Sequence, residues 1–175
     1  MIEHSRHVPL RDFPWNPDAA KQAIAEITTD ALDNFRHDLF WPAHPLDDGL
    51  KDGSSSIYFG AAGLVWGLEH LRRVGAIEAD FDFQRYLPQL LAKTQAEMAA
   101  YGEYAVNGSL LFGDMGTAPL AMRLAPSSTM AELVYMRADA NTHLPIRELM
   151  WGMPGSMLAC LFMSQMTNKA LAVDV

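Results

Sequence analysis

The chain has 175 residues, of which 50% are apolar, and a formal net charge of −8. This apolar content can bury a sizeable core, so a disordered chain is excluded. The acidic balance, with no basic run longer than Arg72-Arg73, excludes the electrostatic footprint of a nucleic-acid-binding protein. The apolar stretches are far shorter than the ~20 residues of a membrane span, and the polar N-terminus lacks the apolar core of a signal peptide. We therefore expect a cytoplasmic protein with no nucleic acid and no membrane as partner.

The first expected elements are an extended lead-in over residues 1–15 and an outer helix. Asn16 and Pro17 are typical of a helix N-cap and of the first helical position. The stretch 41–56 is rich in Pro, Gly, Asp and Ser and predicts a long loop after the helix. On the expected helix, apolar residues recur at steps of three and four, opposite a charged face; they are Ala20, Ile24, Ile27, Ala31 and Phe35.

The middle of the chain predicts two helices. The first runs through Leu64 and Leu71 and ends near Gly75, because arginines and a glycine are favoured at a helix C-terminus. The second is amphipathic and runs from about Tyr86 to about Tyr101.

The last part of the chain predicts three more helices. Thr117 is expected to cap a short helix with Pro119 in its first turn. Thr129 and Glu132 have the spacing of a capping box, which predicts the start of an outer helix. The final helix, from Ser156 to about Met166, is almost wholly apolar and is expected to be buried.

Three segments repeat one short pattern, in which two apolar residues and an aromatic residue precede Gly-x-x-Gly and an apolar helix. The first glycines of the three copies lie about 40 to 50 residues apart, a spacing that indicates stacked helical units. Glycines at a helix start allow a tight turn and the close approach of a neighbouring backbone. The glycines of this structural motif are Gly60 and Gly63, Gly113 and Gly116, and Gly152 and Gly155.

The order of these elements predicts an all-α fold. No stretch alternates with the period of a strand, and apolar inner helices alternate with amphipathic outer ones. Two concentric layers of helices have this pattern, so we expect residues 16–175 to form a partial α/α toroid, or barrel, of three repeats. An incomplete array leaves an apolar edge, so a homo-oligomer is expected, with Leu158, Leu161 and Phe162 partly uncovered.

Three segments of the chain resemble the lanthionine synthetase C-like proteins. They are Gly-Ala-Ala-Gly-Leu at 60–64, Gly-Asp-Met-Gly at 113–116 and Glu-Leu-Met-Trp-Gly-Met-Pro-Gly-Ser-Met-Leu-Ala at 148–159. The resemblance covers roughly residues 18–166 and is strongest in the third segment. It implies an α/α toroid whose cyclase members hold a catalytic zinc. It also implies a role in lantibiotic biosynthesis, in which a zinc-activated cysteine thiol of a peptide substrate adds to a dehydroamino acid and forms a thioether ring.

The zinc ligands of this family are two cysteines and a histidine, in Trp-Cys-x-Gly-like and Cys-His-Gly-like motifs that this chain lacks. Cys160 is the only cysteine and lies in an apolar stretch, so we interpret it as a small buried hydrophobe. One cysteine cannot supply a catalytic zinc site, which needs three protein ligands. We therefore expect the chain to be an N-terminal portion of such a protein, without a metal, a cofactor or cyclase activity of its own.

The resemblance implies one catalytic candidate, Glu148, which lies four places before the first glycine of the third motif. It matches an acidic residue near the active site of the cyclases, where it would act as a general acid or base. The alternative is a surface or capping glutamate. Asp114 is expected to be structural, as an acceptor for free amides at a helix start. His37, His44 and His143 have no spacing that indicates a metal site.

Two functions of other classes remain open. The first is a non-catalytic helical-repeat protein that binds a peptide or a partner through its open apolar face. The second is an α/α-toroid carbohydrate-active enzyme, which needs a pair of carboxylates across the barrel. Glu148 and Asp114 are available for that pair, but no pattern in the sequence brings them together.

Overall fold

The computed structural model describes residues 14–43, 52–101 and 108–167. Within these ranges the chain is helical, with an isolated bridge between Arg36 and Phe40 and no strand. The prediction of an all-α fold is confirmed. The elements are α1 (Pro17–Asp33), α2 (Ala61–Arg73), the short 3-10 helix η2 (Gln84–Tyr86), α3 (Leu87–Ala99), α4 (Asp114–Leu124), α5 (Ser128–Thr142) and α6 (Met153–Thr167).

Helix α1 starts where its sequence predicts, and Ile24, Ala31 and Phe35 pack against the core as expected, but Ile27 does not. The Asn16 side chain accepts hydrogen bonds from the amides of Asp18 and Ala19, at 3.0 and 3.1 Å. Ile27 is 67% exposed, whereas the neighbouring Thr28 is buried. Thr28 can be buried because its hydroxyl donates to the Ile24 carbonyl of the preceding turn. Placing Ile27 on the packed face was therefore wrong.

The predicted caps of α4 and α5 were also wrong. Helix α4 begins directly after Gly113, so Thr117 lies within the helix and Pro119 lies beyond its first turn. The Thr117 hydroxyl contacts the Thr94 hydroxyl of α3 at 3.2 Å. Helix α5 is capped by Ser127, two residues before the expected cap Thr129, and the Ser127 hydroxyl accepts from the Thr129 amide.

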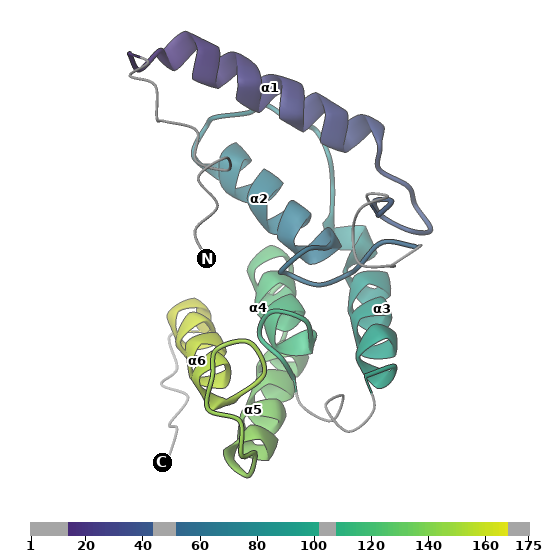
Figure 1. Ribbon diagram of the computed structural model, residues 1–175, viewed down its shortest axis with the longest axis vertical. Coiled ribbons are helices and arrows are strands. Elements are labelled where there is room, and N and C mark those ends of the chain that lie inside the picture. Colours follow the sequence, from purple (N-terminus) through teal and green to yellow (C-terminus); the bar gives the residue numbers. More distant parts are fainter. Residues whose placement is uncertain (1–13, 44–51, 102–107, 168–175) are drawn as a thin grey trace, which may run out of the picture.

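The helices that follow the Gly-x-x-Gly turns lie next to one another. Helix α2 packs on α4 and α4 packs on α6, while α3 and α5 pack on α4, and α5 also on α6 (Figure 1). Each of α2, α4 and α6 begins one residue after the first glycine of its motif, so the second glycine lies in the first helical turn. We call α2, α4 and α6 the inner helices. They position the site described below.

The core has two parts. The aromatic cluster lies around α2, η2 and α3, and consists of Phe35, Phe40, Trp41, Phe81, Phe83 and Tyr86 with the aliphatic residues between them. The methionine cluster lies between α4, α5 and α6, and includes Met115, Met122, Met130, Met163 and Met166 together with Val134 and Cys160. Helix α4 joins the two parts, because Leu120 belongs to the first and Met115 to the second.

Candidate functional site

The three Gly-x-x-Gly turns have one common hydrogen bond. In each turn the side chain four residues before the first glycine accepts from the backbone N–H three residues later. The pairs are the Phe59 amide with Ser56 Oγ at 3.4 Å, the Phe112 amide with Ser109 Oγ at 3.0 Å, and the Trp151 amide with Glu148 Oε1. The three turns are therefore repeats in structure as well as in sequence.

The second glycine of each turn lies where no side chain fits. A Cβ at Gly63, Gly116 or Gly155 would overlap the carbonyl oxygen of the residue six positions earlier. In the second and third turns it would also approach the preceding repeat, at 2.7 Å from Ile57 Cγ1 and 3.0 Å from Leu110 Cβ. The positive φ angles among described glycines are at Gly53 and Gly75. The motif glycines are thus required by close packing, as predicted for a tight approach.

The turns are joined to one another. The Tyr58 amide donates to the Leu111 carbonyl at 3.0 Å, and the Ser109 hydroxyl donates to the Met150 carbonyl. The aromatic residues that precede the first glycines form a continuous row, with ring centroids 5.2 Å apart between Phe59 and Phe112 and 4.8 Å apart between Phe112 and Trp151. We call Phe59, Phe112 and Trp151 the aromatic row.

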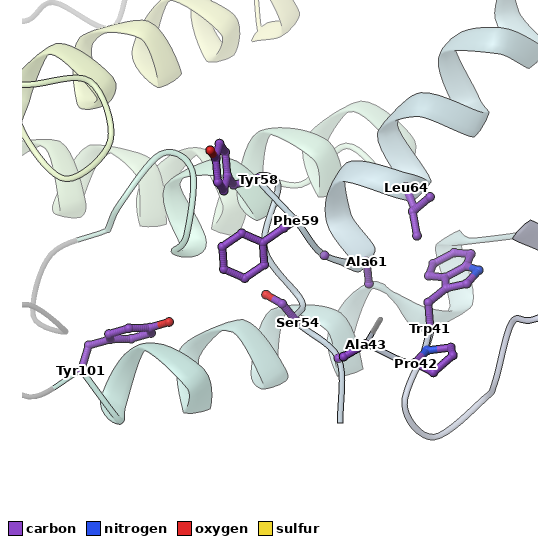
Figure 2. A pocket seen from close by; sticks show the side chains of 11 residues that line it. Trp41, Pro42, Ala43, Ser54, Tyr58, Phe59, Ala61, Leu64 and Tyr101 are labelled. Carbon is purple, nitrogen blue, oxygen red and sulfur yellow. The ribbon is translucent and has the colours of Figure 1, made fainter. Parts of the chain in front are cut away.

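A cavity of about 450 Å³ lies beside the first end of this row. Tyr58, Phe59 and Tyr101 lie on one side of it, and Trp41 and Pro42 lie on the other (Figure 2). Its walls are mostly apolar and aromatic, which is typical of a ligand-binding pocket.

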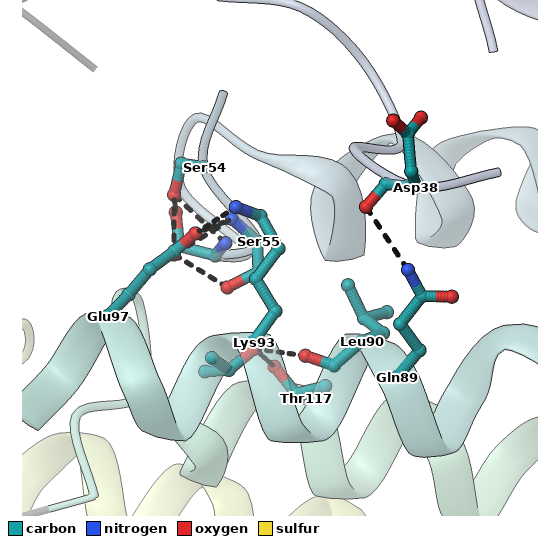
Figure 3. A network of polar contacts seen from close by, with 10 residues as sticks. Asp38, Ser54, Ser55, Gln89, Leu90, Lys93, Glu97 and Thr117 are labelled. Atoms are coloured by element: carbon teal, nitrogen blue, oxygen red, sulfur yellow. Dashed lines mark hydrogen bonds and ion pairs between the residues drawn. The ribbon is translucent and has the colours of Figure 1, made fainter. Parts of the chain in front are cut away.

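The serines before the first turn are buried rather than solvated, and Glu97 of α3 holds them in place. Glu97 Oε2 accepts from the Ser55 amide at 2.9 Å and from the Ser55 hydroxyl at 2.6 Å. Lys93 Nζ lies 3.0 Å from the other carboxylate oxygen, Oε1 (Figure 3). The sequence predicts a long loop over 41–56 but carries no local signal for Glu97, because the partners of Glu97 lie about forty residues earlier. Residues 44–51 of that loop, including His44, lie outside the described residues.

Asp114 is structural, but its role differs from the one expected. It is 2% exposed, and N-capping of α4 falls to Gly113. The carboxylate instead accepts from the Arg137 guanidinium of α5 at 2.8 Å and from the side-chain Nε2 of Gln95 on α3 at 3.3 Å. These contacts make Asp114 a link between α3, α4 and α5.

Glu148 is exposed, and both oxygens of its carboxylate accept backbone hydrogen bonds from the third turn. The Met150 amide donates at 2.7 Å, and the Trp151 amide donates to the other oxygen. This is the capping arrangement considered as the alternative for Glu148. Nothing in the structure tests the catalytic role, which stays a prediction. Ser56 and Ser109 occupy the same place in the other turns, and their shared position before the aromatic residue is a signal that sequence analysis missed.

In the part of the chain that the structure describes, the candidate ligands His37 and His143 are exposed and Cys160 is buried. His37 is exposed and its ring contacts the Tyr86 hydroxyl, and His143 is exposed at the end of α5. Cys160 is 5% exposed, and its burial raises the pKa of the thiol. Among the described residues no three His, Cys, Asp or Glu side chains form a group that could hold a metal ion. The donor set of a Cys-Cys-His zinc site is therefore not found in this part of the chain.

A second cavity, of about 440 Å³, lies between the three inner helices. We call it the inner groove. Its walls include the aliphatic residues of the turns, namely Ile57, Leu110 and Leu149, together with Trp66 of α2, and Leu158 and Phe162 of α6. The backbone carbonyls of the same three aliphatic residues leave no room for a Cβ at the second glycine of each turn. The repeated motif thus builds one wall of an apolar groove.

Two findings bear on the class of the protein. No helix among the described residues is long and apolar enough to cross a membrane. Comparison of the chain with protein-family models, with curated proteins and with solved structures gives no match.

Proposed function

We propose that this chain is the N-terminal portion of a peptide-modifying α/α toroid similar to the lanthionine synthetase C-like proteins, and that its inner groove binds the peptide. The three equivalent turns, each followed by an inner helix, support this relationship. The chemistry of thioether formation would require a zinc site, and the described residues do not fit one, so we assign no chemical step to this chain.

The inner groove is the observation that carries the peptide-binding role. It is predominantly apolar and its volume lies within the range of ~300 to 1,000 Å³ that is typical of ligand pockets. Its aliphatic residues come from three successive turns and lie together at one end of the groove, so they suit a ligand with more than one aliphatic side chain. Phe162 and Trp66 remain 42% and 50% exposed in its walls, which leaves apolar surface for a ligand to cover.

The test uses a labelled peptide that contains aliphatic residues, a cysteine and a dehydroalanine. Binding is measured by fluorescence anisotropy with the wild-type chain and with two variants of neighbouring residues on α6. Phe162→Asp places a charge in the groove and is expected to weaken binding about tenfold or more. Leu161→Asp is the matched control, because Leu161 is 59% exposed and does not line the groove. Equal affinities for all three proteins would overturn the proposed site.

The same peptide tests the assignment of the chemistry. Cyclisation does not change the mass of the peptide, so free thiols are alkylated after incubation and counted by mass spectrometry. We expect the peptide thiol to stay fully alkylatable in the presence of this chain. Loss of the thiol with this chain alone would show that the catalytic residues are within it, and Glu148→Gln would then be the first variant to examine.

A second candidate function is self-association without catalysis, and the outward face of α6 favours it. Met157 and Leu161 are 47% and 59% exposed on this helix, and Leu158 is half-buried. The expected uncovering of Leu161 and Phe162 is thus found. Sedimentation of the wild-type chain beside Leu161→Lys tests this function, which predicts a dimer or larger species that the charge dissociates. A wild-type monomer at high concentration would exclude it.

A further inference from the structure

Two polar side chains, Arg123 and Gln165, lie among the apolar residues at one end of the inner groove. Arg123 is the only charged residue in its walls, and within the described residues its guanidinium makes no hydrogen bond or ion pair. Gln165 lines the same groove, and its amide is likewise without a partner in the described part of the chain. Both side chains are exposed and both can donate hydrogen bonds. The groove therefore offers unused donors to a ligand.

These donors lie at the end of the groove away from the turns. Arg123 is in the last turn of α4 and Gln165 is in the last turn of α6, two helices that pack on each other and both begin at a Gly-x-x-Gly turn. Ile57, Leu110 and Leu149 line the groove from the turns. The groove thus changes along its length from an aliphatic end to an end with one positive charge.

The charge of the groove differs from that of the whole chain. The formal net charge is −8, but no acidic side chain lines the inner groove. A carboxylate bound beside Arg123 would meet a planar guanidinium that can donate two parallel hydrogen bonds, without a like charge in the wall. Charge complementarity therefore selects a ligand that combines aliphatic groups with a carboxylate.

Building on the proposed peptide-binding function, we propose that the inner groove takes a peptide segment in which an Asp or Glu lies about three residues from an aliphatic side chain, with Arg123 and Gln165 binding the carboxylate. The spacing follows from α4. Gly116 lies beneath the second turn, and the helical rise of about 1.5 Å per residue places Arg123 about 10 Å along the groove. An extended peptide covers that length in about three residues.

The test compares three labelled peptides that differ at single features. The first has two leucines followed by a glutamate three residues later, the second has glutamine in place of the glutamate, and the third has serines in place of the leucines. Affinities are measured for the wild-type chain, for Arg123→Gln and for Arg73→Gln. Arg73 is the matched control, because it is also an exposed arginine in the last turn of an inner helix but does not line the groove.

For the wild-type chain we expect the glutamate peptide to bind about fivefold more tightly than the glutamine peptide, as for a solvent-accessible charged pair. Arg123→Gln should abolish this ratio, and Arg73→Gln should preserve it. Gln165→Leu should reduce the ratio partially. The serine peptide should bind most weakly, since it loses the apolar contacts. Melting temperatures of the variants show whether each is folded.

The outcomes separate this inference from the proposed function. Equal binding of the glutamate and glutamine peptides to the wild-type chain would overturn the inference and leave peptide binding intact. No binding of any of the three peptides would overturn both. Laurate is included as a competitor, because a fatty acid also combines a carboxylate with apolar groups. Tighter binding of laurate than of the glutamate peptide would assign the groove to a lipid and overturn the peptide assignment.

Discussion

The aromatic cluster and the methionine cluster reach a buried core in different ways. In the first, the Phe35 ring meets the rings of Trp41, Phe81 and Tyr86 at centroid distances of 5.0, 4.8 and 5.1 Å, with steeply inclined planes. Such edge-to-face contacts between rigid rings have few alternative arrangements. The geometry of this part of the molecule is therefore determined by the shapes of the side chains.

The methionine cluster has flexible side chains and obtains its specificity from buried polar contacts. Methionine has three rotatable bonds and adapts to irregular space, so it defines a packing arrangement poorly. Around the cluster, Asp114 pairs with Arg137, and the Asn141 side chain donates to Ser156 Oγ at 2.6 Å. These contacts join α4 to α5 and α5 to α6. We therefore expect ring shape to order one half of the core and polar pairing to order the other.

The largest expected effect tests the aromatic half. Phe40 is 1% exposed and contacts Phe35 and Tyr86, so Phe40→Ala should lower the free energy of unfolding by about 3–5 kcal/mol. Phe59→Ala is the control, because Phe59 is 46% exposed in the aromatic row and should cost much less. Both values come from urea unfolding followed by circular dichroism. Similar losses for the two variants would contradict a core ordered by ring packing.

The next effect tests the polar contacts of the methionine half. Asp114→Ala removes a buried carboxylate that pairs with the Arg137 guanidinium and accepts from the Gln95 side chain, and should cost about 2–3 kcal/mol because Arg137 is itself partly exposed. Asp139→Ala, an exposed position on the same helix as Arg137, should change stability by less than about 0.5 kcal/mol. If the two losses are equal, the pair does not order the helices. Loss of near-ultraviolet ellipticity at retained helicity in Asp114→Ala would sharpen the comparison.

Replacing glycine by alanine should change the stability of the fold in opposite directions in the two halves of the core. Gly155→Ala would force Cβ against the Leu149 carbonyl oxygen and Leu110, and is expected to cost about 1–3 kcal/mol through overpacking. Gly67 on α2 has no atom within 4 Å of an added Cβ, so Gly67→Ala should stabilise the chain by about 0.5–1 kcal/mol, as helix propensity predicts. Thermal melting of both variants checks the signs. A stabilised Gly155→Ala would show that the turn motif is not under steric constraint.

The smallest expected effect tests whether the methionine cluster shields the Cys160 thiol from solvent. Burial raises the pKa of the Cys160 thiol above its ordinary value of 9.0, so the thiol of the folded chain stays protonated to a higher pH. The protonated thiol contributes its full share of the free energy of unfolding below pH 9.0. This contribution is lost as the pH rises further, because the thiol of the unfolded chain releases its proton at a lower pH than the thiol of the folded chain. The wild-type chain should therefore lose more stability between pH 8 and pH 10 than Cys160→Ala, by less than about 1 kcal/mol. Parallel pH profiles would indicate that the thiol is open to solvent.

Much of the helical pattern follows from the sequence. Local signals such as the N-cap at Asn16 and the glycines of the three turns act on the backbone within a few residues, so they can be recognised without a partner. The burial of Thr28 in place of Ile27 could not be predicted in the same way. The Thr28 hydroxyl donates to a carbonyl of its own helix, so burying it leaves no polar group without a hydrogen bond. The packing of neighbouring segments then decides whether Thr28 or Ile27 is buried.

The candidate site divides in the same manner. The sequence by itself determines the Gly-x-x-Gly turns and the apolar residues that precede them, because both follow from the repeat and its spacing. Only the tertiary structure decides that Glu97 holds the serine loop, that Asp114 pairs with Arg137, and that Arg123 shares a groove with Gln165. These partners come from different helices and lie far apart along the chain. Hydrogen bonds and ion pairs act over a few ångströms, so the packing of those helices selects which polar groups meet.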